Sequence, residues 1–278
     1  MVWIVKRDGR KETFDRKKII RTCIRSGASK EVAEEIAREI ERKVYDGIST
    51  DKILKMVLEL LEEKTLAQAA RYDLKMALFR LGPAGYEFEK FVARLLREYG
   101  YKTRTNVIIK GYCVSHEVDV IAEKDGKIYM IECKFHNTPG IYTGLKEVMY
   151  TYARFLDIKQ GPNDHRFTRA WLFTNTKFSN DAKKFAKCRD VLLTGWKFSG
   201  NESIEKLLER KKLYPITVLR SVSKKEEEIL IDAGFVFCRD LLKENPKIIS
   251  NHTGIKLKKI NEIIREAEKL LGENNEIK

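Results

Sequence analysis

The stretch from Ser115 to Asn137 contains the side chains best suited to chemistry. Its first half alternates polar and apolar residues, which predicts a β-strand with Asp119 on one face. After a turn, a second strand is predicted over 128–135, and Glu132 and Lys134 share one of its faces. Because side chains on a strand repeat every two residues, Asp119, Glu132 and Lys134 can meet across the hairpin. The hairpin therefore predicts two carboxylates beside an ammonium group.

This set of side chains suits phosphodiester hydrolysis. Carboxylate oxygens are the ligands that Mg²⁺ or Mn²⁺ prefers, and a nearby lysine can orient an attacking water and offset phosphate charge. A solvated surface hairpin would carry the same residues, and for the short pattern alone that interpretation is the better one. The apolar run over 128–131 favours the site, because it leaves Glu132 and Lys134 at the end of a buried strand, where unpaired charge is costly.

The pattern also resembles the motif of the PD-(D/E)XK nuclease superfamily, most closely that of its Mrr-like restriction endonucleases. Twelve residues separate Asp119 from the run Glu132-Cys133-Lys134, and Val118 stands where the motif usually has proline. The resemblance implies that Asp119, Glu132 and the carbonyl of Cys133 bind the metal and that Lys134 positions water.

A third carboxylate is implied by the preceding helix, predicted from apolar residues at helical spacing after Phe88. Glu89 lies about 100° from Phe88, at the border of the apolar face. An ordinary boundary glutamate is the simpler interpretation of this position. However, GYEFEKFVARLLREYGY (85–101) resembles the helix that opens Mrr-like domains, where a glutamate joins the metal site. The resemblance assigns that role to Glu89, with Glu87 the weaker candidate.

Two histidines lie near the hairpin. His136 follows Lys134 by two residues on the same face, so it either contacts a nucleic-acid phosphate or is an ordinary polar residue at the strand end. His116 alternates to the face opposite Asp119, and we expect a structural role for it.

The composition indicates a polyanionic partner. Of 278 residues, 43% are hydrophobic, which suffices for two or three domains with ordinary cores. The net charge is +14, and it divides into +5 before Pro83, +7 from there to Gly200 and +2 from Asn201 onward. A cationic surface around an anionic metal site suits DNA, although a charge of this size also serves solubility alone.

Cysteine usage and hydropathy indicate a cytoplasmic protein. The five cysteines form no CxxC pair and no metal-ligand spacing, as expected of reduced thiols. No apolar run approaches eighteen residues, so we expect a soluble protein that does not contact a membrane.

The first 82 residues predict a small, mainly helical domain. VWIVKRDGRKETFD reads as two short strands around Asp8-Gly9, after which Asp15 can N-cap a helix that begins at Arg16. Further helical patterns follow over 38–44, 52–61 and 67–81. Three cations, Lys6, Arg7 and Lys18, gather at the turn and the helix start, where backbone N–H groups favour phosphate.

VKRDGRKETFDRKKI (5–19) and VYDGISTDKI (44–53) resemble the two characteristic stretches of the ATP-cone. The resemblance implies ATP or dATP as ligand, with the triphosphate held by Lys6, Arg7 and Lys18. Nearer the sugar and base it places Glu12, Asp15 and Thr50. A degenerate cone that binds no nucleotide is the alternative. No GxxxxGK[ST] loop occurs in the chain, so we expect ATP to act as a ligand and not as a fuel.

The middle segment predicts a mixed sheet flanked by helices. Strands are expected over 105–109, around the turn at 124–127, and over 169–174 and 191–196; helices are expected over 88–99, 143–157, 181–188 and 203–211. The order αβββαβαβα also resembles the nuclease superfamily core. In the helix over 143–157 we expect the following residues to face inward: Leu145, Val148, Met149, Tyr152, Phe155 and Leu156.

The tail, 217–271, reads as helical with two glycine turns, in IDAGFVFCRDLL and HTGIKLKKINEIIREAEKLL. A glycine at a helix junction exposes backbone N–H groups that can take a DNA phosphate. The pair resembles the helix-hairpin-helix fold, with Lys256 where a second glycine often stands. The resemblance implies DNA contacts by Gly254, Lys256, Lys258 and Lys259. A plain helical interaction module is the alternative.

The sequence thus predicts a multidomain α/β (α+β) chain: a mainly helical ATP-cone (1–82), a mixed-sheet restriction-endonuclease-like core (83–215) and a small all-α domain (216–278). We expect a metal-dependent deoxyribonuclease with DNA as its partner. ATP or dATP is expected to change either its cleavage activity or its assembly, for example into a homodimer. The alternative is a nucleotide-responsive DNA-binding regulator without cleavage. The acid-acid-lysine set argues against it, as does the lack of the zinc ribbon that such a regulator would add.

Overall fold

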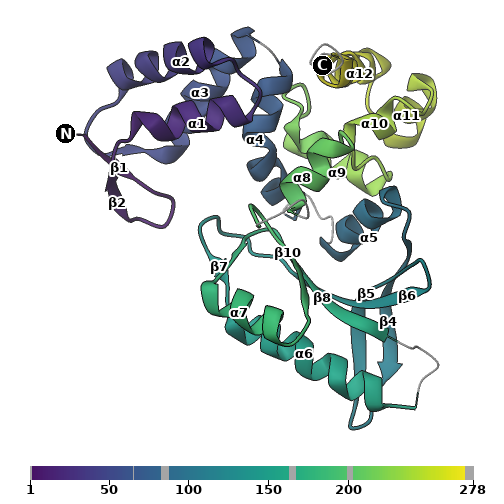
Figure 1. Cartoon of the computed structure of the whole chain (residues 1–278). Coiled ribbons are helices and arrows are strands. Elements are labelled where there is room, and N and C mark those ends of the chain that lie inside the picture. Colours follow the sequence, from purple (N-terminus) through teal and green to yellow (C-terminus); the bar gives the residue numbers. More distant parts are fainter. Residues whose placement is uncertain (1, 65, 83–87, 163–166, 199–202, 273–278) are drawn as a thin grey trace. The chain divides into compact units, whose positions relative to one another are not determined.

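The computed structural model describes residues 2–64, 66–82, 88–162, 167–198 and 203–272. Contacts divide the chain into two units: Met1–Ala77 together with Tyr214–Lys278, and Leu78–Leu213 (Figure 1). The three domain boundaries expected from the sequence stay a prediction. The expected helix stop at Gly82-Pro83 lies partly outside the described residues.

In the first unit, a hairpin and four helices form the N-terminal part. The strands are β1 (Trp3–Val5), β2 (Lys11–Thr13) and β3 (Ile48–Ser49), and the helices are α1 (Arg16–Arg25), α2 (Lys30–Lys43), α3 (Thr50–Lys64) and α4 (Leu66–Leu81). β1 and β2 are antiparallel as predicted, and β3, which the sequence did not predict, pairs parallel with β1. The carboxylate of Asp15 caps α1 by accepting a 2.9 Å hydrogen bond from the N–H of Lys17.

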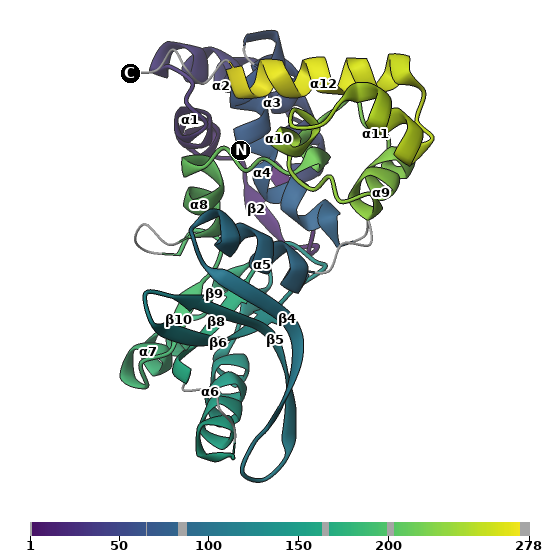
Figure 2. The same ribbon diagram turned by 90° about the vertical axis from the view of Figure 1, so that its right-hand side faces the viewer.

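The tail in the same unit is helical: η1 (Ile216–Val218), α9 (Lys224–Asp232), α10 (Cys238–Leu241), α11 (Pro246–Thr253) and α12 (Leu257–Gly272). Figure 2 shows α12 lying against α10 and α11. Both predicted glycine turns are confirmed, because Gly234 and Gly254 have φ angles of 91° and 70°. Such left-handed backbone strains any residue with a Cβ atom.

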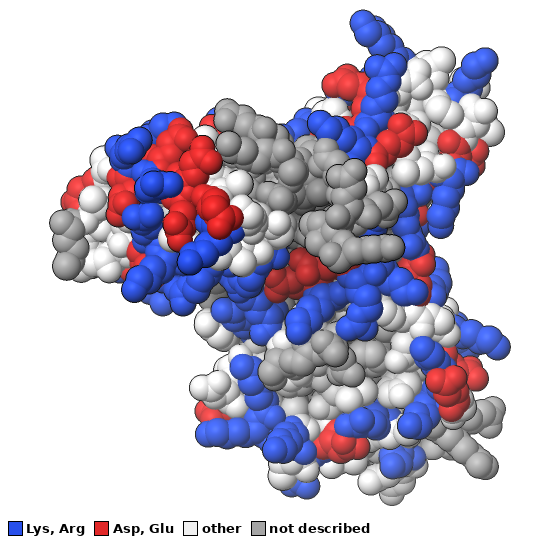
Figure 3. Space-filling view, turned by 45° about the horizontal axis from the view of Figure 1, so that its top comes forward, with Lys and Arg blue, Asp and Glu red and all other residues white. Residues whose placement is uncertain are grey.

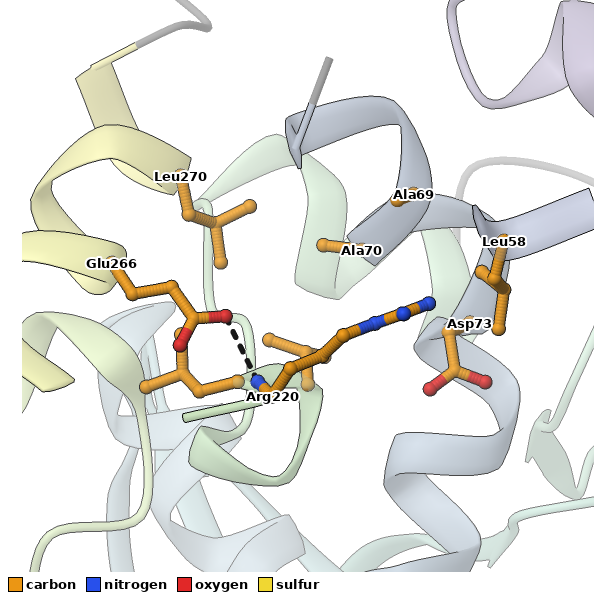
Figure 4. A pocket seen from close by; sticks show the side chains of 9 residues that line it. Leu58, Ala69, Ala70, Asp73, Arg220, Glu266 and Leu270 are labelled. Carbon is orange, nitrogen blue, oxygen red and sulfur yellow. Dashed lines mark hydrogen bonds between the residues drawn. The ribbon is translucent and has the colours of Figure 1, made fainter. Parts of the chain in front are cut away.

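The tail and the N-terminal part of this unit are in contact. The hydroxyl of Thr217 donates a 2.8 Å hydrogen bond to the carbonyl of Ala77. Glu266 accepts hydrogen bonds of 2.8 and 2.9 Å from the N–H groups of Arg220 and Ser221, and Arg220 points along a small cavity toward Asp73 (Figure 4). The cavity is about 20 Å³, which is room for roughly one water and not for a nucleotide.

The second unit is built on a five-stranded mixed sheet of order β10-β8-β6-β5-β4. Its strands are β4 (Lys102–Lys110), β5 (Ser115–Lys124), β6 (Lys127–Lys134), β8 (Phe167–Thr174) and β10 (Leu192–Thr194). β4, β5 and β6 are antiparallel neighbours, and β8 and β10 run parallel to β6, which confirms the predicted mixed sheet. Asp125 and Gly126 have positive φ in the tight turn between β5 and β6.

Helices cover both faces of this sheet (Figure 1). α5 (Phe88–Glu98) packs on β4, β5 and β6 from one side, and α6 (Leu145–Gln160) and α7 (Asn180–Cys188) lie together on the other. The remaining elements of this unit are β7 (Tyr142–Thr143), β9 (Lys177–Phe178), which pairs with it, and α8 (Ile204–Arg210).

The predicted inner face of α6 is partly wrong. Val148 and Phe155 are buried and Tyr152 is half-buried, but the side of the helix with Leu145, Met149 and Leu156 is exposed. The buried stripe is instead completed by Thr151 and Ile158. Apolar residues occur around most of this helix, so periodicity alone selected the wrong set.

Basic side chains are prominent on the face of the molecule that Figure 3 shows. On the face shown in Figure 3, Lys and Arg are spread widely, and Asp and Glu lie among them in smaller groups. Among the described residues, no helix is both long and apolar enough to cross a membrane.

Candidate active site

The carboxylate of Asp119 lies where β5 and β6 part. The backbone pairing of these strands runs from Lys124↔Lys127 to Val120↔Ile131. One residue further, Oδ2 of Asp119 accepts a 2.7 Å hydrogen bond from the backbone N–H of Cys133. A side chain here replaces a backbone acceptor, so the sheet itself fixes the position of the carboxylate.

Glu132 is held by an arginine that the sequence did not single out. Its Oε2 forms an ion pair with Nη1 of Arg154 on α6, and Nη2 of Arg154 donates to the carbonyl of Glu117. Both partners are largely buried, with side chains 20% and 11% exposed. The guanidinium also lies over the ring of Tyr150, 5.3 Å from its centroid.

Burial and nearby negative charge make both carboxylates costly to ionise. The pKa of Glu132 is raised to about 7, first by burial and then by the negative charge of Asp119, against the opposing charge of Arg154. Burial also raises the pKa of Asp119, against the N–H of Cys133 and the charge of Arg154. Partly buried carboxylates in this situation are stabilised in their charged form by a cation.

Lys134 lies at a cavity beside Glu132. The cavity is about 280 Å³, and its lining is Glu132, Lys134, Lys146, Glu147, Tyr150 and Leu172. Lys134 is exposed, and its charge lowers the pKa of Glu132. Within the described ranges it forms no ion pair of its own, so its ammonium can serve a ligand in the cavity.

Glu89 is half-buried in the first turn of α5, and its charge raises the pKa values of Asp119 and Cys133. It is therefore within electrostatic reach of the site. Among the described residues, however, no three or more His, Cys, Asp or Glu side chains are gathered closely enough to hold a metal ion. The metal-ligand roles of Asp119, Glu132, Glu89 and the carbonyl of Cys133 stay predictions. Glu87 lies outside the described residues.

The hairpin histidines have protein partners. Nε2 of His116 lies 2.7 Å from Oδ2 of Asp157, so its expected structural role is supported. The backbone N–H of His136 donates to Asn175, and Nε2 of its ring lies 3.1 Å from the hydroxyl of Thr143. Burial lowers the pKa of His136, which favours its neutral form. These contacts favour the strand-end interpretation of His136, and a phosphate contact stays a prediction.

The predicted nucleotide-binding cations gather around acidic residues. Nζ of Lys6 and Nζ of Lys18 lie 2.8 and 2.9 Å from the two carboxylate oxygens of Glu12. Arg7 pairs with Asp51, a residue that the sequence analysis missed. The remaining predicted positions are the cap of α1, Asp15, and the first residue of α3, Thr50. The structure thus brings Lys6, Lys18 and Glu12 together.

In the tail, the predicted DNA contacts surround the junction of α11 and α12. Gly254 ends α11, donating its N–H to the carbonyl of Ser250. The carbonyl of Lys256 accepts from the N–H groups of Lys259 and Ile260 and so starts α12. Lys256 and Lys258 are exposed, and Lys259 pairs with Glu262 at 3.2 Å.

Comparison with protein-family models assigns three segments. Residues 2–80 match the ATP cone domain, 83–198 a restriction endonuclease domain, and 214–271 the model described as AF1548-like, C-terminal. The predicted order of an ATP-cone, a restriction-endonuclease-like core and a C-terminal helical domain is thereby confirmed.

An uncharacterized protein of Archaeoglobus fulgidus is 54% identical over 181 residues, which is 65% of this chain and 100% of the relative. The chain belongs to the AF1548-like family. A second uncharacterized protein of the same organism is 62% identical over 34 residues, 12% of this AF1548-like chain and 72% of that protein. The solved structure described as a protein of unknown function, AF1548, is 54% identical and covers 66% of this chain and 97% of its own, with a TM-score of 0.57.

Proposed function

We propose that this AF1548-like protein is a Mg²⁺- or Mn²⁺-dependent DNA endonuclease whose output responds to ATP or dATP. The observation that carries the proposal is the electrostatic influence of Asp119 on Glu132. Both carboxylates are partly buried and have raised pKa values, and Glu132 lines a cavity together with Lys134. The restriction endonuclease match over 83–198 supports the same reaction class.

The proposed donors are carboxylate and carbonyl oxygens, the atom types that a hard divalent cation prefers. Asp119 and Glu132 would hold it, with Glu89 and the carbonyl of Cys133 completing the shell. A bound cation lowers the pKa of water and polarises a phosphoryl oxygen. Lys134, which has no ion pair within the described residues, would orient the attacking water and offset the charge of the scissile phosphate.

DNA is the substrate that the charge distribution favours. The nuclease segment carries the largest basic excess, +7, and Lys146 lies in the same cavity wall as Lys134. In the tail, Gly254, Lys256, Lys258 and Lys259 would bind backbone phosphates without reading sequence. His136 would act by fixing the strand end through Thr143.

The nucleotide would act as an effector. Lys6 and Lys18 now pair with Glu12, and Arg7 pairs with Asp51. A bound triphosphate would replace these carboxylates as the partner of the three cations. An effector changes output only through a difference between two states, such as domain packing or a homodimer. The match of residues 2–80 to the ATP cone domain supports this assignment.

A DNA-binding regulator without cleavage is the second candidate. It is favoured by the pairing of Glu132 with Arg154 and by the lack of a gathered metal cluster in the described part of the chain. Both candidates bind DNA, so binding alone does not separate them.

The separating experiment incubates the purified chain with supercoiled plasmid, linear duplex and single-stranded DNA, with Mg²⁺, Mn²⁺ or EDTA, each with and without ATP. We expect nicks or breaks that need the divalent ion and that change in rate with ATP. DNA bound in gel shifts yet uncut under every one of these conditions would favour the regulator.

A further inference from the structure

Arg154 is an unusual neighbour for a metal site, because it brings a fixed positive charge to the carboxylate that a cation would use. Arginine stays protonated in proteins, so this charge cannot be removed by pH. In the described part of the chain, Arg154 is the one hydrogen-bond donor to the side-chain carboxylate of Glu132. The carboxylate therefore already has a counterion before any metal binds.

The surroundings keep the guanidinium in place. Nη2 is anchored on the carbonyl of Glu117, the ring of Tyr150 lies 5.3 Å away, and the side chain is 11% exposed. Its buried Nε has no hydrogen-bond partner among the described residues. A buried donor left unsatisfied costs folding free energy, so stability alone does not account for an arginine here.

From this geometry we propose that Arg154 is a positioning residue: it serves as the internal counterion of Glu132, holding that carboxylate ready and setting how tightly the site binds a divalent cation. The inference rests on the proposed metal-dependent function and deepens it. Glu132 is oriented by Arg154 in the free protein, and the same charge then opposes the incoming cation.

The size of the opposition follows from Coulomb's law. Two cations that share one carboxylate lie roughly 6 Å apart or less. Even with the dielectric constant of water, a charge of +1 at that separation weakens binding of a +2 ion by about tenfold. Partial burial of Glu132 and Arg154 makes the effect larger, because solvent screens the pair less.

The test is a calorimetric titration of the full chain with Mn²⁺, in the absence of DNA. Arg154→Met removes the charge and keeps much of the volume, and Arg154→Lys keeps the charge. As a matched control, Arg169→Met removes an arginine of the same unit that pairs with Asp190. Asp119→Asn shows whether the heat arises at the proposed site. Circular dichroism checks that each variant folds, and Arg154→Gln replaces Arg154→Met if the latter does not.

We expect Arg154→Met or Arg154→Gln to bind Mn²⁺ about tenfold or more tightly than wild type, while Arg154→Lys and Arg169→Met stay within about threefold of it. Unchanged or weaker binding in the uncharged variants overturns the counterion role, and so does an equal change in Arg154→Lys, which would indicate packing. If wild type binds Mn²⁺ and Asp119→Asn does not, the proposed metal site stands whatever the Arg154 result. If no variant binds Mn²⁺, both proposals fall.

Discussion

The carboxylate of Asp119 accepts a 2.7 Å hydrogen bond from the backbone N–H of Cys133, across the point where two central strands separate. The side chain thus has two tasks, satisfying a sheet N–H and supplying charge. Alanine at this position would leave the N–H without its acceptor, which costs about 1–3 kcal/mol when buried. Asparagine keeps a carbonyl oxygen for that bond and removes only the charge, so it is the cleaner test of chemistry.

Lys134→Ala is expected to slow DNA cleavage by roughly a hundredfold, because the ammonium would offset charge that develops on the phosphate. Lys127→Ala is the matched control. Lys127 is also exposed, but it lies at the opposite end of β6 from Lys134. Single-turnover rates at saturating DNA measure the effect. Equal rates for the two variants would remove Lys134 from the site.

Lys6→Ala combined with Arg7→Ala is expected to abolish binding of ATP and dATP and to leave a folded nuclease. These side chains sit at the hairpin turn, paired with Glu12 and Asp51, and a triphosphate would replace those partners. Isothermal titration measures binding. Replacing Arg42 and Lys43, two exposed cations at the end of α2, removes the same charge and should leave binding intact.

A non-hydrolysable ATP analogue should reproduce any effect of ATP on cleavage, because no GxxxxGK[ST] loop occurs in the chain. An ATP effect that the analogue fails to produce would indicate a hydrolytic site that the sequence analysis overlooked.

Asp157 is expected to contribute stability that disappears in acid. It accepts hydrogen bonds from Cys113 and His116, and the N–H of Cys113, followed by His116, lowers its pKa to about 2. Because the pKa of Asp157 is lower in the folded protein than its unfolded value of 3.8, the ionised carboxylate stabilises the fold at pH values above 3.8. This stabilisation is lost as the pH falls from about 4 to about 2. Calorimetry should show Asp157→Asn melting below wild type at pH 7, with the difference shrinking across that window.

Asp181→Asn is the control for this pH dependence, since Asp181 is exposed and pairs only with Lys184 in the described part of the chain. A melting difference between wild type and Asp157→Asn that stays constant from pH 7 to pH 2 would contradict the assignment.

DNA affinity is expected to fall steeply with salt. Each phosphate neutralised by Lys or Arg adds about 0.9 to the slope of log affinity against log salt for duplex DNA. Replacing both Lys256 and Lys258, which are exposed at the start of α12, should lower that slope by about two. Fluorescence anisotropy across salt concentrations measures it, and an unchanged slope would argue that the tail does not bind DNA.

The hairpin could be predicted because its information is local. The spacing of Asp119, Glu132 and Lys134 follows from strand alternation and a two-residue turn at Asp125 and Gly126, and the structure has both. The bond from Cys133 to Asp119 was beyond prediction, because it depends on where the strands stop pairing and not on residue type.

Arg154 escaped the sequence analysis for a physical reason. It lies on α6, 22 residues after Glu132, so contact between them depends on how that helix is rotated over the sheet. The rotation was misjudged because Leu145 and Met149 look as apolar as the buried Val148. An arginine between Thr151 and Phe155, both on the buried stripe, was the available signal. The pairing of Arg7 with Asp51 is similarly non-local.

The most direct test of the central claim compares wild type with Asp119→Asn in cleaving one DNA substrate with Mg²⁺, with DNA affinity measured in parallel. We predict that cleavage falls by a hundredfold or more while the affinity for DNA and the melting temperature stay close to those of wild type. Cleavage by purified Asp119→Asn at the wild-type rate would contradict the assignment of this hairpin as the active site.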